Sequence, residues 1–104
     1  MTIEQMFTEA KLEQLLPRYE CTRGLRMRFR GKATTLYREV TLEPGQPPGI
    51  DDRIRFTQVG RERYTLSVLL HTGRWERTPF VGSLDELVDV IASTMPHLVA
   101  PWPA

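Results

Sequence analysis

The chain has 104 residues, of which 40% are hydrophobic and 26% are charged, and its formal net charge at pH 7 is +1. This length and composition predict one globular domain over residues 1–104 with a single core, and they exclude a disordered or low-complexity chain. No apolar run approaches the roughly 20 residues that a membrane-spanning helix needs, so we expect no membrane contact. The single cysteine, Cys21, cannot form an internal disulfide, and the N-terminal residues lack the pattern of a secretory signal. Both features favour a cytoplasmic protein.

Charge is distributed unevenly along the chain. Residues 1–20 have a net charge of −2 and residues 81–104 of −3. Residues 21–80 contain eleven arginines and one lysine against six acids, which is a net charge of +6. This asymmetry indicates either an anionic partner or acidic helices that complement a basic sheet within the fold.

The N-terminal segment predicts a helix over residues 3–16. Thr2 and Gln5 fit a capping box, in which each side chain accepts a hydrogen bond from the backbone N–H of the other residue. The apolar residues that follow recur at helical spacing. They are Ile3, Met6, Phe7 and Ala10. Pro17 is expected to end the helix.

Residues 25–30 alternate strictly between apolar and arginine side chains, which is the pattern of a strand with one buried face. Gly31 and Lys32 suit a two-residue hairpin loop with glycine at its first position. This loop sets apolar residues opposite apolar residues. It also sets Arg26 opposite Tyr37, where we expect a cation–π contact.

A long irregular loop is predicted over residues 43–50, which contain three prolines and two glycines. The strand that follows alternates apolar residues with arginines up to Phe56. A three-residue loop at residues 60–62 pairs Phe56 with Leu66, whereas a two-residue loop pairs apolar with polar residues. We therefore expect the three-residue loop.

The last elements are a fifth strand and a second helix. A turn at residues 72–73 leads to a strand over residues 74–78, which sets Trp75 beside Leu70 on the core side and Arg74 on the opposite side.

The second helix begins after a capping box at Ser83 and Glu86 and is expected to end at Pro96. Residues 95–104, which include Trp102, are expected to form an extended tail.

The order helix, five strands, helix predicts an α+β fold. We expect a two-layer sandwich, in which a five-stranded antiparallel meander is covered on one face by an N-terminal and a C-terminal helix. The opposite, outer face of the sheet is rich in arginine, whose guanidinium group binds carboxylates and phosphates and stacks on aromatic rings. The candidate partner-binding residues on this face are Arg26, Arg28, Arg30, Tyr37, Arg53, Arg55, Arg63, Leu69 and Arg74.

These residues favour a small non-catalytic interaction domain that binds a protein partner, or its own copy, through the outer face. Leu69 among arginines, with little lysine, is typical of protein interfaces. The alternative is binding of single-stranded nucleic acid with Tyr37 as the stacking residue, although a single ring and a nearly neutral chain argue against it. A third alternative is a solvated face, whose arginines pair with Glu39 and Glu76.

No residue pattern indicates a catalytic centre, a cofactor or a metal. His71 and His97 are not at metal-ligand spacing, and the glycines are spaced as turns rather than as a phosphate-binding loop. The remaining hypothesis is a small-ligand or enzymatic pocket between sheet and helices, bordered by residues 43–50 with Cys21, His71 or Tyr64 nearby.

Overall fold

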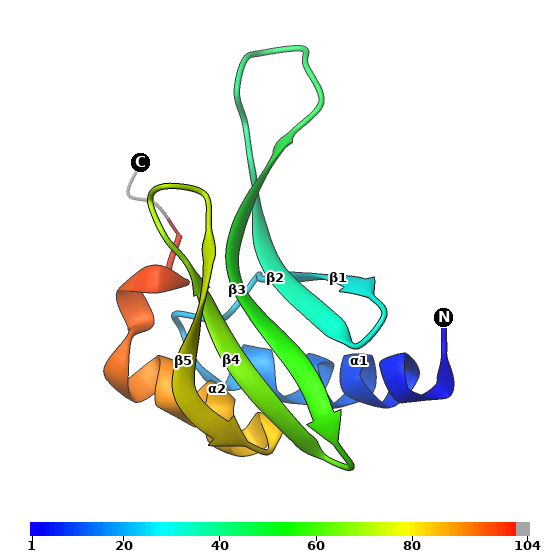
Figure 1. Ribbon diagram of the computed structural model, residues 1–104. Helices are drawn as coiled ribbons and strands as arrows, with labels where there is room; N and C mark the ends of the chain where they lie inside the picture. The colour runs from blue at the N-terminus through cyan, green and yellow to red at the C-terminus, as the bar shows by residue number, and fades with distance from the viewer. Residues whose placement is uncertain (102–104) are drawn as a thin grey trace.

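Five antiparallel strands form one sheet and lie side by side in chain order (Figure 1). The computed structural model describes residues 1–101. The strands are β1 (Arg26–Arg30), β2 (Ala33–Val40), β3 (Gly49–Gly60), β4 (Arg63–Leu69) and β5 (Trp75–Gly82). The helices are α1 (Ile3–Leu15) and α2 (Leu84–Thr94), each followed by one 3-10 turn, η1 (Leu16–Arg18) and η2 (Pro96–Leu98). The predicted α+β architecture is confirmed.

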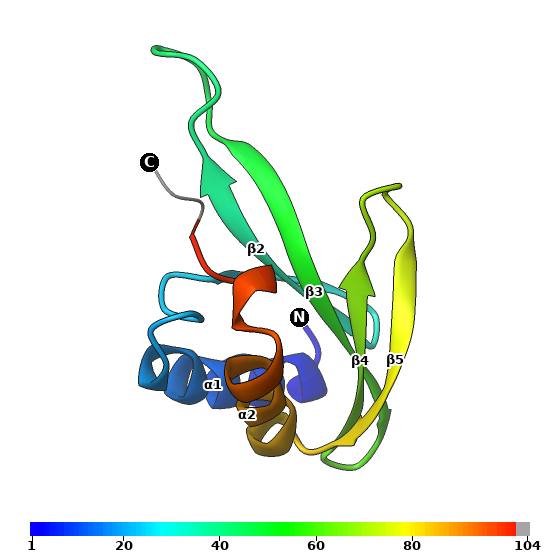
Figure 2. The same ribbon diagram turned by 90° about the vertical axis from the view of Figure 1, so that its left-hand side faces the viewer.

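Both helices lie on the same side of the sheet, which leaves the other face without a covering layer (Figure 2). The capping boxes at Thr2 and Ser83 are both formed, so each helix begins where the sequence predicts. The core between the two layers is apolar. Its fully or almost fully buried members include Leu12 and Leu15 of α1, Leu87, Val88 and Ile91 of α2, and Leu36, Ile54, Phe56 and Leu66 of the sheet.

Two hairpin registers agree with the prediction. Arg26 pairs with Tyr37 across β1 and β2. Phe56 pairs with Leu66 across β3 and β4, although an irregularity after Gln58 takes the place of the expected three-residue loop. Apolar residues therefore face the helices on both hairpins, as the alternation requires.

The β4–β5 hairpin differs from the prediction by one residue. Trp75 pairs with Leu69 and not with Leu70. The loop has three residues and ends at Gly73, whose φ of +86° is the left-handed conformation that such loops require. The N–H of Leu70 closes the loop by donating to the carbonyl of Arg74 over 2.8 Å. Because a one-residue shift exchanges the faces, the predicted sides of Trp75 and Arg74 are both wrong.

A β-bulge in β3 moves Arg53 to the helix side of the sheet. Leu36 pairs with Ile54, but the next residue of β2, Tyr37, pairs with Asp52, so Arg53 is the extra residue. A bulge resets the alternation of the strand. Arg53 is only 5% exposed and does not lie on the outer face where the sequence placed it.

Helix α1 packs through residues other than its most regular apolar stripe. Thr8 and Leu12 face the sheet, and the Thr8 and Tyr64 hydroxyl groups form a buried 2.7 Å hydrogen bond. The large apolar side chains exposed on α1 are Ile3 (70%), Met6 (57%) and Phe7 (72%). Helix α1 therefore carries apolar residues on the side that faces the sheet and also on the exposed side.

The β2–β3 hairpin projects beyond the body of the protein as an arm (Figures 1 and 2). On this arm, Leu42 and Ile50 are 67% and 58% exposed. The chain end differs from the extended tail that was predicted, because residues 96–98 form the η2 turn. Trp102 lies outside the described residues.

Candidate functional site

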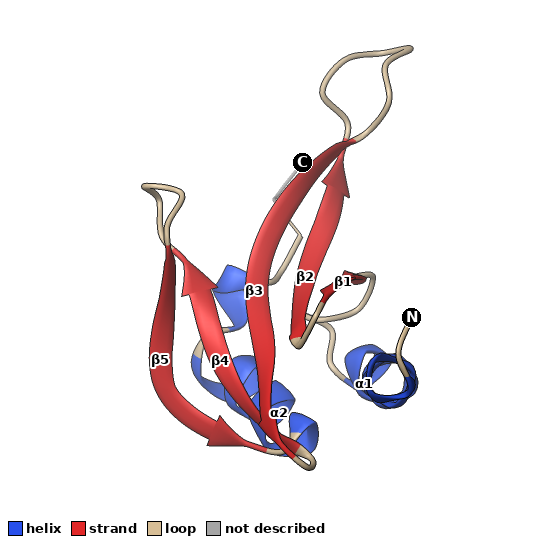
Figure 3. Cartoon of the chain, turned by 45° about the vertical axis from the view of Figure 1, so that its right-hand side comes forward, coloured by secondary structure: helices blue, strands red, loops and turns tan. Residues whose placement is uncertain are grey.

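The outer face of the sheet carries a row of arginines separated by small hydroxyl residues. The strand pairing aligns Arg28, Thr35, Arg55, Ser67 and Arg77 across all five strands. Side chains two strands apart are separated by about 9.5 Å, since neighbouring strands lie about 4.8 Å apart. The row lies on the face opposite the buried residues Leu36, Ile54 and Leu66, and Figure 3 shows α2 behind the strands. No other helix or strand among residues 1–101 therefore covers this row.

Arg55 stacks on Trp75 at the middle of this face. The guanidinium carbon lies 4.2 Å from the centre of the ring. The Arg55 Nε donates to the Thr35 hydroxyl over 3.2 Å, which fixes the side chain from its other edge. Leu69 pairs with Trp75 on the neighbouring strand. Arginine, tryptophan and leucine thus form one cluster on the outer face.

A second arginine–aromatic pair lies at the β1 edge. The guanidinium carbon of Arg28 is 5.7 Å from the centre of the Tyr37 ring, and its Nη2 donates to Asp52 over 2.9 Å. Arg26, which was expected over this ring, instead forms an ion pair with Glu39 at 2.7 Å. The bulge that moves Arg53 away brings Asp52 opposite Tyr37, so it supplies the acid that holds Arg28.

Between these two pairs lies a shallow hollow of about 310 Å³, lined by Arg28, Arg30, Ala33, Thr35 and Arg55. Three guanidinium groups around one hollow suit a carboxylate or phosphate group. Within residues 1–101, the side chains of Arg30 and Arg77 make no hydrogen bond or ion pair. Their donors are therefore available to a partner.

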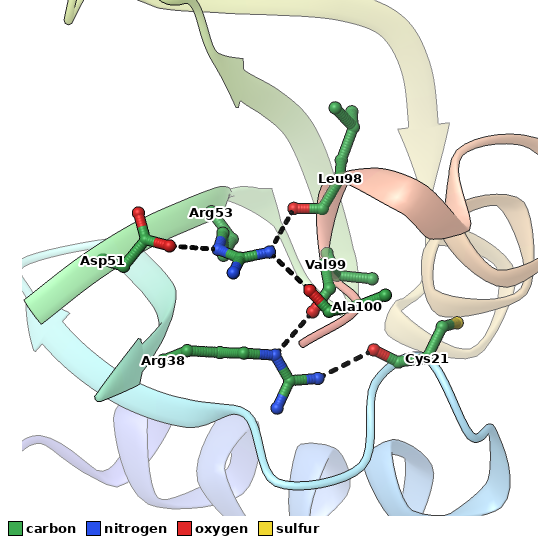
Figure 4. A network of polar contacts seen from close by, with 7 residues as sticks. All are labelled: Cys21, Arg38, Asp51, Arg53, Leu98, Val99 and Ala100. Atoms are coloured by element: carbon green, nitrogen blue, oxygen red, sulfur yellow. Dashed lines mark hydrogen bonds and ion pairs between the residues drawn. The ribbon is translucent and has the colours of Figure 1, made fainter. Parts of the chain in front are cut away.

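On the helix side of the same strands, Arg38 and Arg53 have a different role (Figure 4). Arg38 donates to the carbonyls of Val99, Arg23 and Cys21 over 2.7, 3.0 and 2.9 Å.

Arg53 donates to the carbonyls of Leu98 and Ala100 over 3.1 and 2.8 Å and to Asp51 over 2.8 Å (Figure 4). Burial, and to a lesser degree the neighbouring charge of Arg53, lowers the pKa of the Arg38 guanidinium. Together the two arginines tie the η2 turn and the α1–β1 connection to the sheet.

The structure thus separates the predicted site residues into two groups. Six of them share the outer face by strand register: Arg26, Arg28, Arg30, Tyr37, Arg55 and Leu69. Arg63 is the first residue of β4, next to the β3–β4 turn. It lies on the same face by strand alternation and is exposed. Arg53 and Arg74 belong to the helix side.

Sequence reasoning missed Trp75 and Arg77, which the shifted β4–β5 register brings to the outer face. Glu76, which was expected there, pairs with Val68 on the other side. Gly73 was the available signal, because a three-residue loop that ends in glycine is a common hairpin connection.

The predicted pocket residues do not form one site. A groove of about 880 Å³ lies between α1, the β3–β4 turn and the start of α2, and Tyr64 lines it while Cys21, His71 and the 43–50 loop do not. Within residues 1–101, no three His, Cys, Asp or Glu side chains are grouped as metal ligands. No helix in this part of the chain has the length and hydropathy to cross a membrane.

Comparison of the chain with protein-family models, with curated protein sequences and with solved structures finds no match.

Proposed function

We propose that this protein is a small non-catalytic interaction domain that binds a protein partner through the outer face of its sheet. The observation that carries the proposal is the cluster of Arg55, Trp75 and Leu69 on a sheet face that no helix covers. Tryptophan and arginine are the residues most enriched at the energetic centres of protein interfaces. The stacking of Arg55 on the ring pre-positions both side chains, which reduces the entropy that binding has to overcome.

The partner surface that fits this face is acidic. Arginines outnumber acids on it, and Arg30 and Arg77 form no ion pair within residues 1–101. The hollow beside Arg30 accepts one carboxylate, and the spacing of the arginine row accepts further carboxylates about 9.5 Å apart. A free cysteine thiol is compatible with a reducing compartment, so we place this interaction in the cytoplasm.

The test is differential capture of a partner by two double variants with the same change in charge. Arg30→Glu/Arg77→Glu reverses two outer arginines whose side chains make no hydrogen bond or ion pair within residues 1–101. Arg18→Glu/Arg74→Glu reverses two exposed arginines outside the outer face and is the control. The partner captured by the wild-type chain is then produced pure, and its affinity for each variant is measured by titration calorimetry.

We expect the outer-face variant to weaken binding at least tenfold, because each lost charge-assisted contact is replaced by like-charge repulsion. The control should bind within a factor of about three, and both variants should keep the melting temperature of the wild type. Equal affinity of the two double variants would contradict the proposal.

Single-stranded nucleic acid is the second candidate, favoured by one specific observation. Trp75 adds a second ring to a face on which only Tyr37 was expected, and successive bases stack on such rings. Fluorescence anisotropy with a labelled oligonucleotide of about 15 nucleotides at low salt tests this function. Micromolar binding that weakens steeply with salt and is lost in Trp75→Ala supports it, and the absence of binding excludes it.

A further inference from the structure

Several exposed apolar side chains lie away from the arginine face, along the groove beside α1. The groove is bordered by α1, by the β3–β4 turn and by the first residues of α2. Its apolar lining comes from Ile3, Phe7, Ala10, Val59, Tyr64 and Leu84. Phe7 is 72% exposed and Val59 is 51% exposed, which is unusual for side chains of this size.

The α1 wall of this groove has the pattern of a helix-packing surface. Ile3, Phe7, Ala10 and Gln14 follow one another at spacings of four, three and four residues, so they form one stripe along the helix. The stripe contains one large ring and one small side chain. The inward stripe of α1, which includes Leu12, is already buried against the sheet. The outward stripe is therefore free for a second helix.

We propose that a second copy of this chain occupies the groove, with the two α1 helices packed antiparallel about a twofold axis. In such a pair, residue n of one helix lies opposite residue 17 − n of the other when the axis passes between Thr8 and Glu9. This arrangement places each Phe7 over the Ala10 of the other copy. A large side chain over a small one is the complementarity that close helix packing requires.

The charges beside the stripe complement each other in the same arrangement. Glu4 and Lys11 lie on the groove side of α1, and both line the groove. The twofold axis places this side of one helix beside the same side of the other helix, and the two helices run in opposite directions. Glu4 of one copy therefore lies near Lys11 of the other, twice in each dimer. Lys11 also pairs with Asp85 of its own chain at 3.1 Å, so it is held at the rim of the groove.

The experiment measures the oligomeric state by sedimentation velocity over a range of protein concentrations. Phe7→Glu places a charge at the centre of the proposed interface. Leu42→Glu is the matched control, since Leu42 is 67% exposed and lies on the β2–β3 arm. We expect the wild type and Leu42→Glu to dimerise and Phe7→Glu to be monomeric. At protein concentrations at which the wild type is monomeric, both variants should unfold at the wild-type temperature, because neither side chain is buried within one chain.

A charge exchange tests the direction of the helices. Glu4→Lys and Lys11→Glu should each weaken the dimer about tenfold, and the double variant should restore it, because it rebuilds both ion pairs with reversed sign. The proposal is overturned by a wild-type chain that stays monomeric at millimolar concentration. It is also overturned by a dimer that Phe7→Glu leaves intact, or by one that Arg30→Glu/Arg77→Glu dissociates. A double variant as weak as the single variants excludes the antiparallel pairing.

Discussion

Arginines on the two faces of this sheet differ in what they contact. On the helix side, Arg38 and Arg53 donate to five backbone carbonyls and hold the η2 turn and the α1–β1 connection. On the outer face, Arg55 stacks on Trp75, and Arg30 and Arg77 contact no other described side chain through a hydrogen bond or ion pair. The first group is part of the folded structure, and the second is available for binding.

The role of an arginine in this sheet depends on strand register more than on local sequence. Arg53 and Arg55 are two residues apart on one strand, yet the bulge places them on opposite faces. A buried guanidinium needs acceptors for its donors, and the backbone carbonyls of Leu98, Val99 and Ala100 at the end of a 3-10 turn provide them.

Replacement of Arg53 by Met should destabilise the protein most. The variant removes the hydrogen bonds that Arg53 donates to the carbonyls of Leu98 and Ala100 and to the Asp51 carboxylate. Hydrogen bonds to charged groups contribute about 1.5–3 kcal/mol each, so we expect the free energy of unfolding to fall by roughly 3 kcal/mol. Urea denaturation measures it as a lower midpoint with an unchanged slope.

Arg38→Met should have a similar effect for the same reason, since Arg38 donates to three carbonyls. Arg38→Lys is the informative second variant, because it keeps the charge but not the planar fork. A midpoint for Arg53→Met within error of the wild type would show that these contacts do not hold the chain end.

The Arg55–Trp75 stack should contribute an intermediate amount. A double-mutant cycle with Arg55→Ala and Trp75→Ala removes the cation–π contact, and we expect a coupling energy of about 0.5–1 kcal/mol. Thermal and urea unfolding of the four proteins provide the values. Additive effects of the two substitutions would mean that the ring and the guanidinium do not interact in solution.

The hydrogen bond between Tyr19 and Asp89 should make the free energy of unfolding depend on pH at high pH. The Tyr19 hydroxyl donates to Asp89 over 3.2 Å, and desolvation, followed by this hydrogen bond, raises the pKa of Tyr19 above 10.0. The folded state therefore retains the proton longer than the unfolded state does. This stabilisation is complete below pH 10 and is lost as the pH rises through the folded-state pKa.

Tyr19→Phe should accordingly lose stability less steeply above pH 10 than the wild type does. The measurement is the urea midpoint of both proteins between pH 8 and pH 11. Parallel pH profiles would contradict the assignment.

Single replacements of the free outer arginines should have the smallest effect on folding. Arg30→Ala and Arg77→Ala remove no hydrogen bond or ion pair within residues 1–101, so we expect changes within about 0.5 kcal/mol. The contrast with Arg53→Met, measured under the same conditions, defines the two groups. A loss of 2 kcal/mol or more at either position would place that arginine with the structural group.

Local sequence patterns predicted the fold well because they act over a few residues. The capping boxes at Thr2 and Ser83 predicted where both helices begin, and the alternation of residues 25–30 predicted the register of the first hairpin. The face of the sheet on which Arg53 lies depended on one extra residue in a bulge. The face on which Trp75 lies depended on one extra residue in the β4–β5 loop. The alternation pattern of a strand contains no signal for an inserted residue.

The exposed stripe of α1 could not be assigned from the sequence for a related reason. Helical spacing identifies Ile3 and Phe7 as one face and Leu12 as another, but it does not say which face the sheet covers. The buried hydrogen bond between Thr8 and Tyr64 joins residues 56 positions apart, and it orients the helix through tertiary structure alone.

The outer face can be tested most directly by photo-cross-linking with the captured partner. A small diazirine-bearing residue is placed at Ser67, in the middle of the arginine row, or at Ser93, which is exposed on α2. The account predicts a covalent adduct of the partner with the Ser67 variant and none with the Ser93 variant. An adduct at Ser93 in the absence of one at Ser67 would contradict the assignment of the outer face as the binding surface.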